Sequence, residues 1–329
     1  MKDKIFIQGY GSSGGTLVGD FFYEFDNMNY LYRREFDLFR GSGGIYELGN
    51  LIEESCTYTK DSMIRRFYKL IDFLEKWGFV DFYGQDFRKL SMEFANNLIF
   101  TKMDTDVRHY SINETIKPPR NLIRPLYKLA IKFLRDVNYD KNSYILNNLT
   151  KDEYILLAKK YMQDIFNLLP SDKHTVLHHP FIIDLKLDKQ IPYFDGNYKV
   201  FIVDKDPRDI YTVMYELAFS IPCYTYALDI DKWIKIYKQD RRYEEHNMDL
   251  LKNKVMKVRC EDFINNYDSY SKKIINFVGL KEENHVNKFK YFNPEISKQY
   301  VGKYKTFKNQ KIITKIEKEL AEYIYEREI

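Results

Sequence analysis

A turn rich in glycine and serine near the N-terminus could bind an anion through its backbone. Residues 5–8 form a short apolar run that predicts a buried β-strand, and apolar side chains from Leu17 to Phe25 recur at helical spacing. The turn between them consists of Gly11, Ser12, Ser13, Gly14, Gly15 and Thr16. Its N–H groups and the N-terminus of the next helix would favour a phosphate. The alternative is a plain tight turn.

Residues 9–16 nearly match the nucleotide-binding spacing G-x-x-x-x-G-K-[S/T]. Gly15 stands where that pattern requires lysine. The missing lysine argues against the chemistry of a kinase or an ATPase.

Two cations follow a second apolar run, at residues 198–203. Lys205 and Arg208 come directly after it, and arginine can make a bidentate contact with phosphate. The alternative is a turn with a capped helix, in which Asp206 or Asp209 caps the helix and Arg208 is solvated.

His178 and His179 end a third strand signal, at residues 174–180, and are the best candidates for a general base. Because neighbouring residues of a strand point to opposite faces, we expect at most one of them to face a ligand. A core or surface histidine without a catalytic role is the alternative. The other histidines have no cysteine or carboxylate at ligand spacing, so no metal is expected.

A basic segment at residues 298–305 could close over a phosphate. It contains Lys298, Gly302 and Lys303. By itself it would be interpreted as a solvated run of charge.

These segments need a parallel sheet to bring them together. A fourth strand signal lies at residues 255–258, and strands that alternate with helices predict an α/β fold with a P-loop-like parallel sheet flanked by helices. Ligands of such sheets bind at the carboxyl ends of the strands, where all these residues fall.

Residues 29–170 have helical apolar spacing and little strand signal, most clearly at 61–77, 122–134 and 154–169. We interpret residues 1–329 as one domain, with a large helical insertion at about 29–170 that forms an acceptor-side lid. A set of ordinary crossover helices is the alternative.

The composition narrows the class of protein. A formal net charge of +4 over 329 residues gives no strong basic field for a nucleic-acid polymer. Three scattered cysteines suit a reducing compartment. No apolar run is long enough for a membrane span and no signal-peptide region is found, so a cytoplasmic location is expected. The 29 tyrosines could contact sugar rings, or could reflect codon bias.

Taken in the order in which they occur along the chain, the motifs resemble those of the cytosolic-type sulfotransferases, which use 3′-phosphoadenosine 5′-phosphosulfate (PAPS). Residues 6–17 are similar to the loop for the 5′-phosphosulfate, and residues 200–210 to the strand, turn and helix for the 3′-phosphate. Residues 258–263 with 276–280 resemble the family's R-Y-E-D-L and F-L-G-L pair, and residues 301–305 its G-x-W-K loop. Residues 177–180 are similar to the segment with the catalytic histidine, which points to His178.

The sequence departs from the family at several cations. Ser12 replaces a lysine or arginine, and Val176 replaces a lysine two residues before the histidine. The nearest hydroxyl to a family serine on the helix after Arg208 is Thr212. A cation from the insertion could replace the charge that is missing at these positions. The candidates are Arg33, Arg34 and Arg40.

The resemblance implies a PAPS-dependent sulfotransferase without a metal, acting on an acceptor hydroxyl of a small molecule or, more specifically, of a carbohydrate or glycan precursor. It implies His178 as base, with His179 as its neighbour. The 5′-phosphosulfate would be held by residues 11–16, and the 3′-phosphate by Lys205, Arg208, Thr212, Lys298, Gly302 and Lys303. Two alternatives stay open: a non-catalytic nucleotide-binding or scaffold protein, favoured by Ser12 and Val176, and a P-loop phosphotransferase.

Overall fold

A five-stranded, entirely parallel sheet forms the centre of the computed structural model, which describes residues 3–53, 56–104, 142–182 and 186–325. The sheet order is β2-β5-β1-β6-β7. Its strands are β1 (Lys4–Gly9), β2 (Met28–Glu35), β5 (His174–His178), β6 (Tyr198–Asp204) and β7 (Val255–Arg259). The predicted α/β fold is confirmed. The helical signal at residues 122–134 lies outside the described residues.

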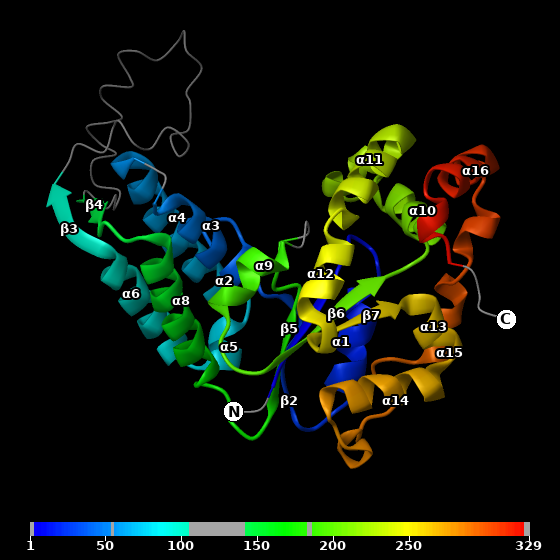
Figure 1. Ribbon diagram of the computed structural model, residues 1–329, viewed down its shortest axis with the longest axis horizontal. Helices are drawn as coiled ribbons and strands as arrows, with labels where there is room; N and C mark the ends of the chain where they lie inside the picture. The colour runs from blue at the N-terminus through cyan, green and yellow to red at the C-terminus, as the bar shows by residue number, and fades with distance from the viewer. Residues whose placement is uncertain (1–2, 54–55, 105–141, 183–185, 326–329) are drawn as a thin grey trace, which may run out of the picture.

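Helices cover both faces of this sheet (Figure 1). The helices of the first half are α1 (Gly15–Tyr23), α2 (Asp37–Arg40), α3 (Ile45–Leu51), α4 (Thr57–Lys76), α5 (Phe79–Tyr83), α6 (Asp86–Leu98) and α8 (Lys151–Phe166). Those of the second half are α9 (Leu187–Gln190), α10 (Pro207–Leu217), α11 (Ile230–Arg241), α12 (Glu244–Leu251), α13 (Cys260–Asn265), α14 (Tyr267–Val278), α15 (Pro294–Ser297) and α16 (Gln310–Glu319). Short 3₁₀ turns connect them at η2 (Ile191–Tyr193), η3 (Pro222–Leu228), η4 (Lys252–Lys254), η5 (Glu282–Asn284), η6 (Lys298–Tyr300), η7 (Lys303–Thr306) and η8 (Ala321–Tyr323).

The alternation of side chains along the strands divides the core into two layers. In β1, Phe6 packs into the cluster that includes the buried residues of α3, α4, α6 and α8. Its neighbours Ile5 and Ile7 pack on the other face with α1, α13 and α14. Because successive residues of a strand face opposite sides, one short apolar run supplies both layers. None of the described helices is long and apolar enough to cross a membrane.

The expectation of little strand in residues 29–170 is wrong at two places. β2 lies at the edge of the sheet and pairs in parallel with β5. β3 (Ile99–Asp104) and β4 (Asn142–Leu146) form a separate antiparallel pair. β2 carries exposed charged residues at its end, as an edge strand can, so it lacks the continuous apolar run that identifies β6.

Candidate active site

The glycine turn connects β1 to α1 and is held in place from two sides. Ser13 is buried, and its Oγ donates a hydrogen bond to the Val203 carbonyl of β6 at 2.8 Å. On the other side, the Cys260 thiol of α13 donates to the Ser13 carbonyl at 3.1 Å. Gly14 has φ of +93°, and a Cβ there would lie 2.3 Å from the Cys260 sulfur. Only glycine fits that position, because both the conformation and the space exclude a side chain.

The first turn of α1 therefore begins at a defined place, at the carboxyl end of the sheet. Gly14 is its N-cap and makes no side-chain cap hydrogen bond. The first N–H groups of a helix have no acceptor within the helix, and the helix dipole adds partial positive charge. This end of α1 can therefore accept an anion.

Both histidines border this helix terminus. A Cβ on Gly15 would lie 2.9 Å from His179 Nε2 and 3.5 Å from His178 Nε2. The two imidazole rings are neighbours, with centroids 4.4 Å apart. Gly15 stands where the nucleotide-binding pattern has a lysine. Because Gly15 has no side chain, the two rings can approach the helix.

The expectation that at most one histidine faces the site is therefore wrong. His178 is the last residue of β5, and His179 lies beyond the strand with φ of +45°. The His179 N–H donates to the Ile7 carbonyl at 2.8 Å. Because this left-handed conformation ends the alternation of the strand, both rings come to the same side.

Burial keeps both histidines neutral near pH 7. Burial, with a smaller effect of the Arg40 charge, lowers the pKa of His178 to about 4. Burial lowers the pKa of His179 well below its ordinary value, and His178 and Arg40 lower it further. His178 is 5% exposed, and neither of its ring nitrogens has a hydrogen-bond partner in the part of the chain that is described. A neutral imidazole with unpartnered nitrogens can accept a proton from a ligand.

Lys205 lies on the other side of the turn. It is buried, and it follows Asp204 at the end of β6, the strand beside β1. Its positive charge partly offsets the rise that burial causes in the pKa of Cys260, which contacts the turn, and of Asp209 in α10. Lys205 is therefore the predicted cation that lies between the turn and α10.

Arg208 is bound to acidic side chains of the protein. Asp206 caps α10 by accepting from the Arg208 N–H at 2.8 Å, and it also accepts from Arg208 Nη2 at 2.7 Å. Glu317 accepts from Arg208 Nη1 at 2.8 Å, and the guanidinium lies over the Tyr304 ring. The capped-helix alternative is thus correct for Asp206, whereas the idea of a solvated Arg208 is wrong, since its side chain is 12% exposed.

The remaining predicted residues gather around α10. Thr212 is buried and donates to the Arg208 carbonyl at 2.8 Å. Asp209 accepts from the N–H groups of Gly302 at 2.7 Å and of Tyr304 at 3.0 Å, which attaches the C-terminal loop to α10. Two of the three lysines in residues 298–305 make ion pairs nearby: Lys298 with Glu295 and Lys303 with Glu216.

A buried charge network behind the turn was not predicted from the sequence. Asp204 is fully buried between Arg241 at 2.7 Å and Arg259 at 3.2 Å. Arg241 lies over the rings of Tyr10 at 3.9 Å and Tyr237 at 3.4 Å. Tyr10 directly precedes the glycine turn, so the network joins the start of the turn to α11. Arg241 lies 37 positions from Asp204 in the sequence, and no motif around it indicates a role at this site.

Glu261 connects α13 to the turn after β6. Its Oε1 accepts from the Asp206 N–H at 2.7 Å, and burial raises its pKa to about 7. This carboxyl group therefore titrates near neutral pH, close to Asp206 and Arg259.

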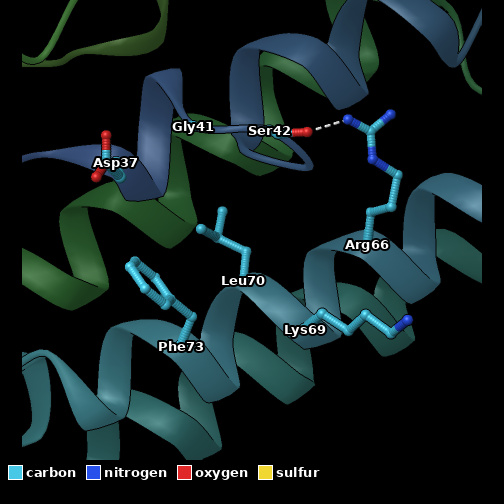
Figure 2. Close-up of a pocket in the computed structure, with 7 residues that line it drawn as sticks. All are labelled: Asp37, Gly41, Ser42, Arg66, Lys69, Leu70 and Phe73. Carbon is cyan, nitrogen blue, oxygen red and sulfur yellow. Dashed lines mark hydrogen bonds between the residues drawn. The ribbon is translucent and has the colours of Figure 1, made fainter. Parts of the chain in front are cut away.

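An open pocket of about 440 Å³ lies beside α2, on the side of the insertion. Figure 2 shows Arg66 of α4 reaching across it to Ser42, with Leu70 and Phe73 from the same helix. Asp37, Gly41 and Lys69 complete its lining. The pocket offers hydroxyl, charged and aromatic groups to a ligand.

No group of three or more His, Cys, Asp or Glu side chains is arranged to hold a metal among the residues that the structure describes.

Comparisons with known proteins add little. No family model matches the sequence, and no curated protein matches it. The chain is similar to the sulfotransferase domain from the Synechococcus PCC 7002 olefin synthase, with 11% identity and a TM-score of 0.45 over 99% of this chain and 97% of that one. It is also similar to the sulfotransferase domain from the curacin biosynthetic pathway, with 13% identity and a TM-score of 0.46 over 98% of each chain. Likenesses this distant carry no weight for function, which has to come from this chain's own residues.

Proposed function

We propose that this chain is a sulfotransferase that moves a sulfuryl group from PAPS to an acceptor hydroxyl. The observation that supports it most is the convergence of the α1 N-terminus, two neutral histidines and Lys205 on one glycine turn. The unpartnered nitrogens of His178 and the space at Gly15 suit an anionic group bound there.

The nucleotide, when bound, supplies the sulfuryl group on its 5′-phosphate. The N–H groups of Ser12, Gly14, Gly15 and Thr16 would hold the 5′-phosphosulfate, with Ser12 and Thr16 adding hydroxyls. Ser13 would not take part, because its N–H donates to the Tyr10 carbonyl at 3.0 Å and its Oγ to the Val203 carbonyl. Lys205 would hold the 3′-phosphate as the main cation. Arg208, Lys298 and Lys303 could join it only by exchanging an acidic partner for the phosphate, because each is ion-paired.

His178 would take the proton of the acceptor hydroxyl. The acceptor oxygen then bonds to sulfur while the sulfur–oxygen bond to the nucleotide breaks, and 3′-phosphoadenosine 5′-phosphate (PAP) leaves. The protein contributes positioning and charge stabilisation, as in phosphoryl transfer. His179 closes the site beside His178.

The insertion at about 29–170 would serve as the acceptor-side lid of a single domain. A carbohydrate or glycan precursor is the proposed acceptor, since the pocket beside α2 combines Asp37, Ser42 and Arg66 with the Phe73 ring. Aromatic rings with polar neighbours suit sugars.

A titration with PAP tests the nucleotide site. Lys205→Ala should weaken PAP binding at least about tenfold, because a charge-assisted contact is lost. Lys199→Ala is the matched control: Lys199 lies at the start of the same strand and should not affect binding. Absence of PAP binding to the unaltered chain would contradict the proposal.

Transfer of radiolabelled sulfate to a panel of glycans and phenols then separates an enzyme from a binding protein. His178→Ala should abolish transfer and leave PAP binding intact, whereas His246→Ala, at an exposed histidine, should change neither transfer nor PAP binding. PAP binding without transfer by the unaltered chain would favour a non-catalytic nucleotide-binding protein, which the ion-paired cations around α10 also suit.

A further inference from the structure

We propose that Arg40, at the end of α2, is the cation that contacts the transferred sulfuryl group beside His178 and His179. This inference rests on the proposed function and names the residue that compensates for Ser12. The three candidates that the sequence offers in the insertion are separated by their positions.

The other two arginines bind other groups of the protein. Arg33 pairs with Asp20 at 2.9 Å, and its side chain is 56% exposed. Arg34 lines a narrow cavity of about 10 Å³ together with His178, but its guanidinium lies over the Trp77 ring at 4.6 Å. Neither acts on the pKa of His178 or His179.

Arg40 is joined to the histidines by a short chain of contacts. Glu35 of β2 is the register partner of His178, and the next residue, Phe36, donates its N–H to the His178 carbonyl at 2.8 Å. Arg40 makes an ion pair with that Glu35, and its Nε donates to Asp37 Oδ1 at 3.2 Å. The guanidinium is thereby fixed near the end of β5, with a side chain only 18% exposed.

Its third nitrogen is available to a ligand. Nη2 binds Glu35 and Nε binds Asp37, while Nη1 makes no hydrogen bond to any described residue. Nη1 carries two N–H donors, and the guanidinium keeps its positive charge, which suits an oxygen of a sulfate or phosphate. A ligand oxygen could therefore bind Nη1 without displacing either carboxylate.

The charge that reaches the histidines is positive, although two carboxylates flank Arg40. The charged groups around the rings are Glu35 from β2 and Asp37 and Arg40 from α2, and the Arg40 charge is the one that lowers the pKa of His178. The histidines, the α1 N-terminus and Arg40 thus present donors and positive potential to one place. A sulfuryl group there would be stabilised as negative charge accumulates on its oxygens.

Inorganic sulfate is the probe, because it needs no nucleotide site. Sulfate binding to the unaltered chain should raise the pKa of His178, as read from the imidazole NMR signals. Arg40→Gln should raise that pKa without sulfate and weaken sulfate binding about tenfold or more. Arg40→Lys keeps the charge and should retain most of the binding. Arg33→Gln, with the same loss of charge at an exposed site, should change neither quantity.

Sulfate binding by Arg40→Gln equal to that of the unaltered chain would overturn the proposal, as would no sulfate binding by the unaltered chain itself. If Arg40→Gln fails to fold, Arg40→Lys decides: unchanged His178 signals on sulfate addition would likewise overturn it. In transfer assays, Arg40→Gln should lower kcat while PAP affinity stays within a few fold. Failure of the unaltered chain to bind PAP would reject the proposed function and leave the sulfate result to stand for Arg40.

Discussion

The two sides of the glycine turn differ in how their charged and polar groups are satisfied. On the histidine side, both nitrogens of His178 are buried without a described partner, and Arg40 retains Nη1 for a ligand. On the α10 side, Asp204 binds two arginines, Arg208 binds two carboxylates, and Asp209 accepts two backbone N–H groups.

Unpartnered buried polar groups cost free energy, so a folded protein keeps them mainly where a ligand or an ordered water satisfies them. The ion pairs on the α10 side instead hold the turn and the C-terminal loop in place, although the Tyr211 and Tyr237 hydroxyls and Glu261 Oε2 there are also buried without a described partner. The histidine side thus keeps unpartnered groups for the proposed ligand, whereas the α10 side is primarily structural and, on the proposed function, would bind phosphate only by giving up an existing ion pair.

The largest expected effect tests whether the α10 side is structural. Asp204→Asn should lower the free energy of unfolding by about 3–5 kcal/mol, because Arg241 and Arg259 would keep buried charges without their partner. Urea unfolding measures it. The control is Asp231→Asn, which breaks an exposed pair with Lys315 and should cost no more than about 0.5 kcal/mol. Equal costs for the two variants would remove the distinction between the two sides.

A second effect concerns the pH dependence of stability on the histidine side. The folded pKa of His178 is about 4 against an ordinary 6.5, so the unfolded chain binds more protons between these values. Stability from this group is therefore complete above about pH 6.5 and is lost as the pH falls towards 4, in total about 3 kcal/mol.

Urea unfolding from pH 4 to 7 checks this expectation. His178→Gln should reduce the slope in that window, while His179, whose pKa burial also lowers, should keep part of it. His246→Gln, at an exposed position, should leave the slope unchanged. No change of slope in His178→Gln would contradict this expectation.

The smallest effect sharpens the description of Arg208. Glu317 is 43% exposed and binds Arg208 Nη1, so Glu317→Gln should free Nη1, while Asp206 keeps Nε and Nη2, and strengthen PAP binding about two- to fivefold. Isothermal titration calorimetry can resolve such a change. Glu319→Gln is the matched control, since Glu319 in the same helix pairs with Lys238 instead. Weaker PAP binding in Glu317→Gln would show that Arg208 does not contact the nucleotide.

Much of the fold could be predicted because buried strands and amphipathic helices leave local patterns. The apolar run before the glycine turn and the run at residues 198–203 correspond to β1 and β6. β2 was missed because an edge strand needs fewer apolar residues, and its charged end concealed it. Of the site, the turn, His178 and Lys205 were visible from their places after strands.

Other parts of the site could not be predicted, since they depend on contacts between distant segments. The joint placement of both histidines follows from a left-handed residue at the end of β5. Arg241 reaches Asp204 across 37 positions of sequence. The pairing of Arg208 with Glu317 spans 109 positions.

The sequence by itself determined the parallel α/β architecture, the glycine turn and the set of residues at the carboxyl ends of the strands, because hydrophobic period and turn chemistry are local properties. Only the tertiary structure decided which of those residues keep groups for a ligand. Partner choice among charged side chains depends on burial and on neighbours from other elements. This is why Arg208 is ion-paired while His178 is not, and why the charge of Arg40, rather than that of Arg33 or Arg34, lowers the pKa values of the histidines.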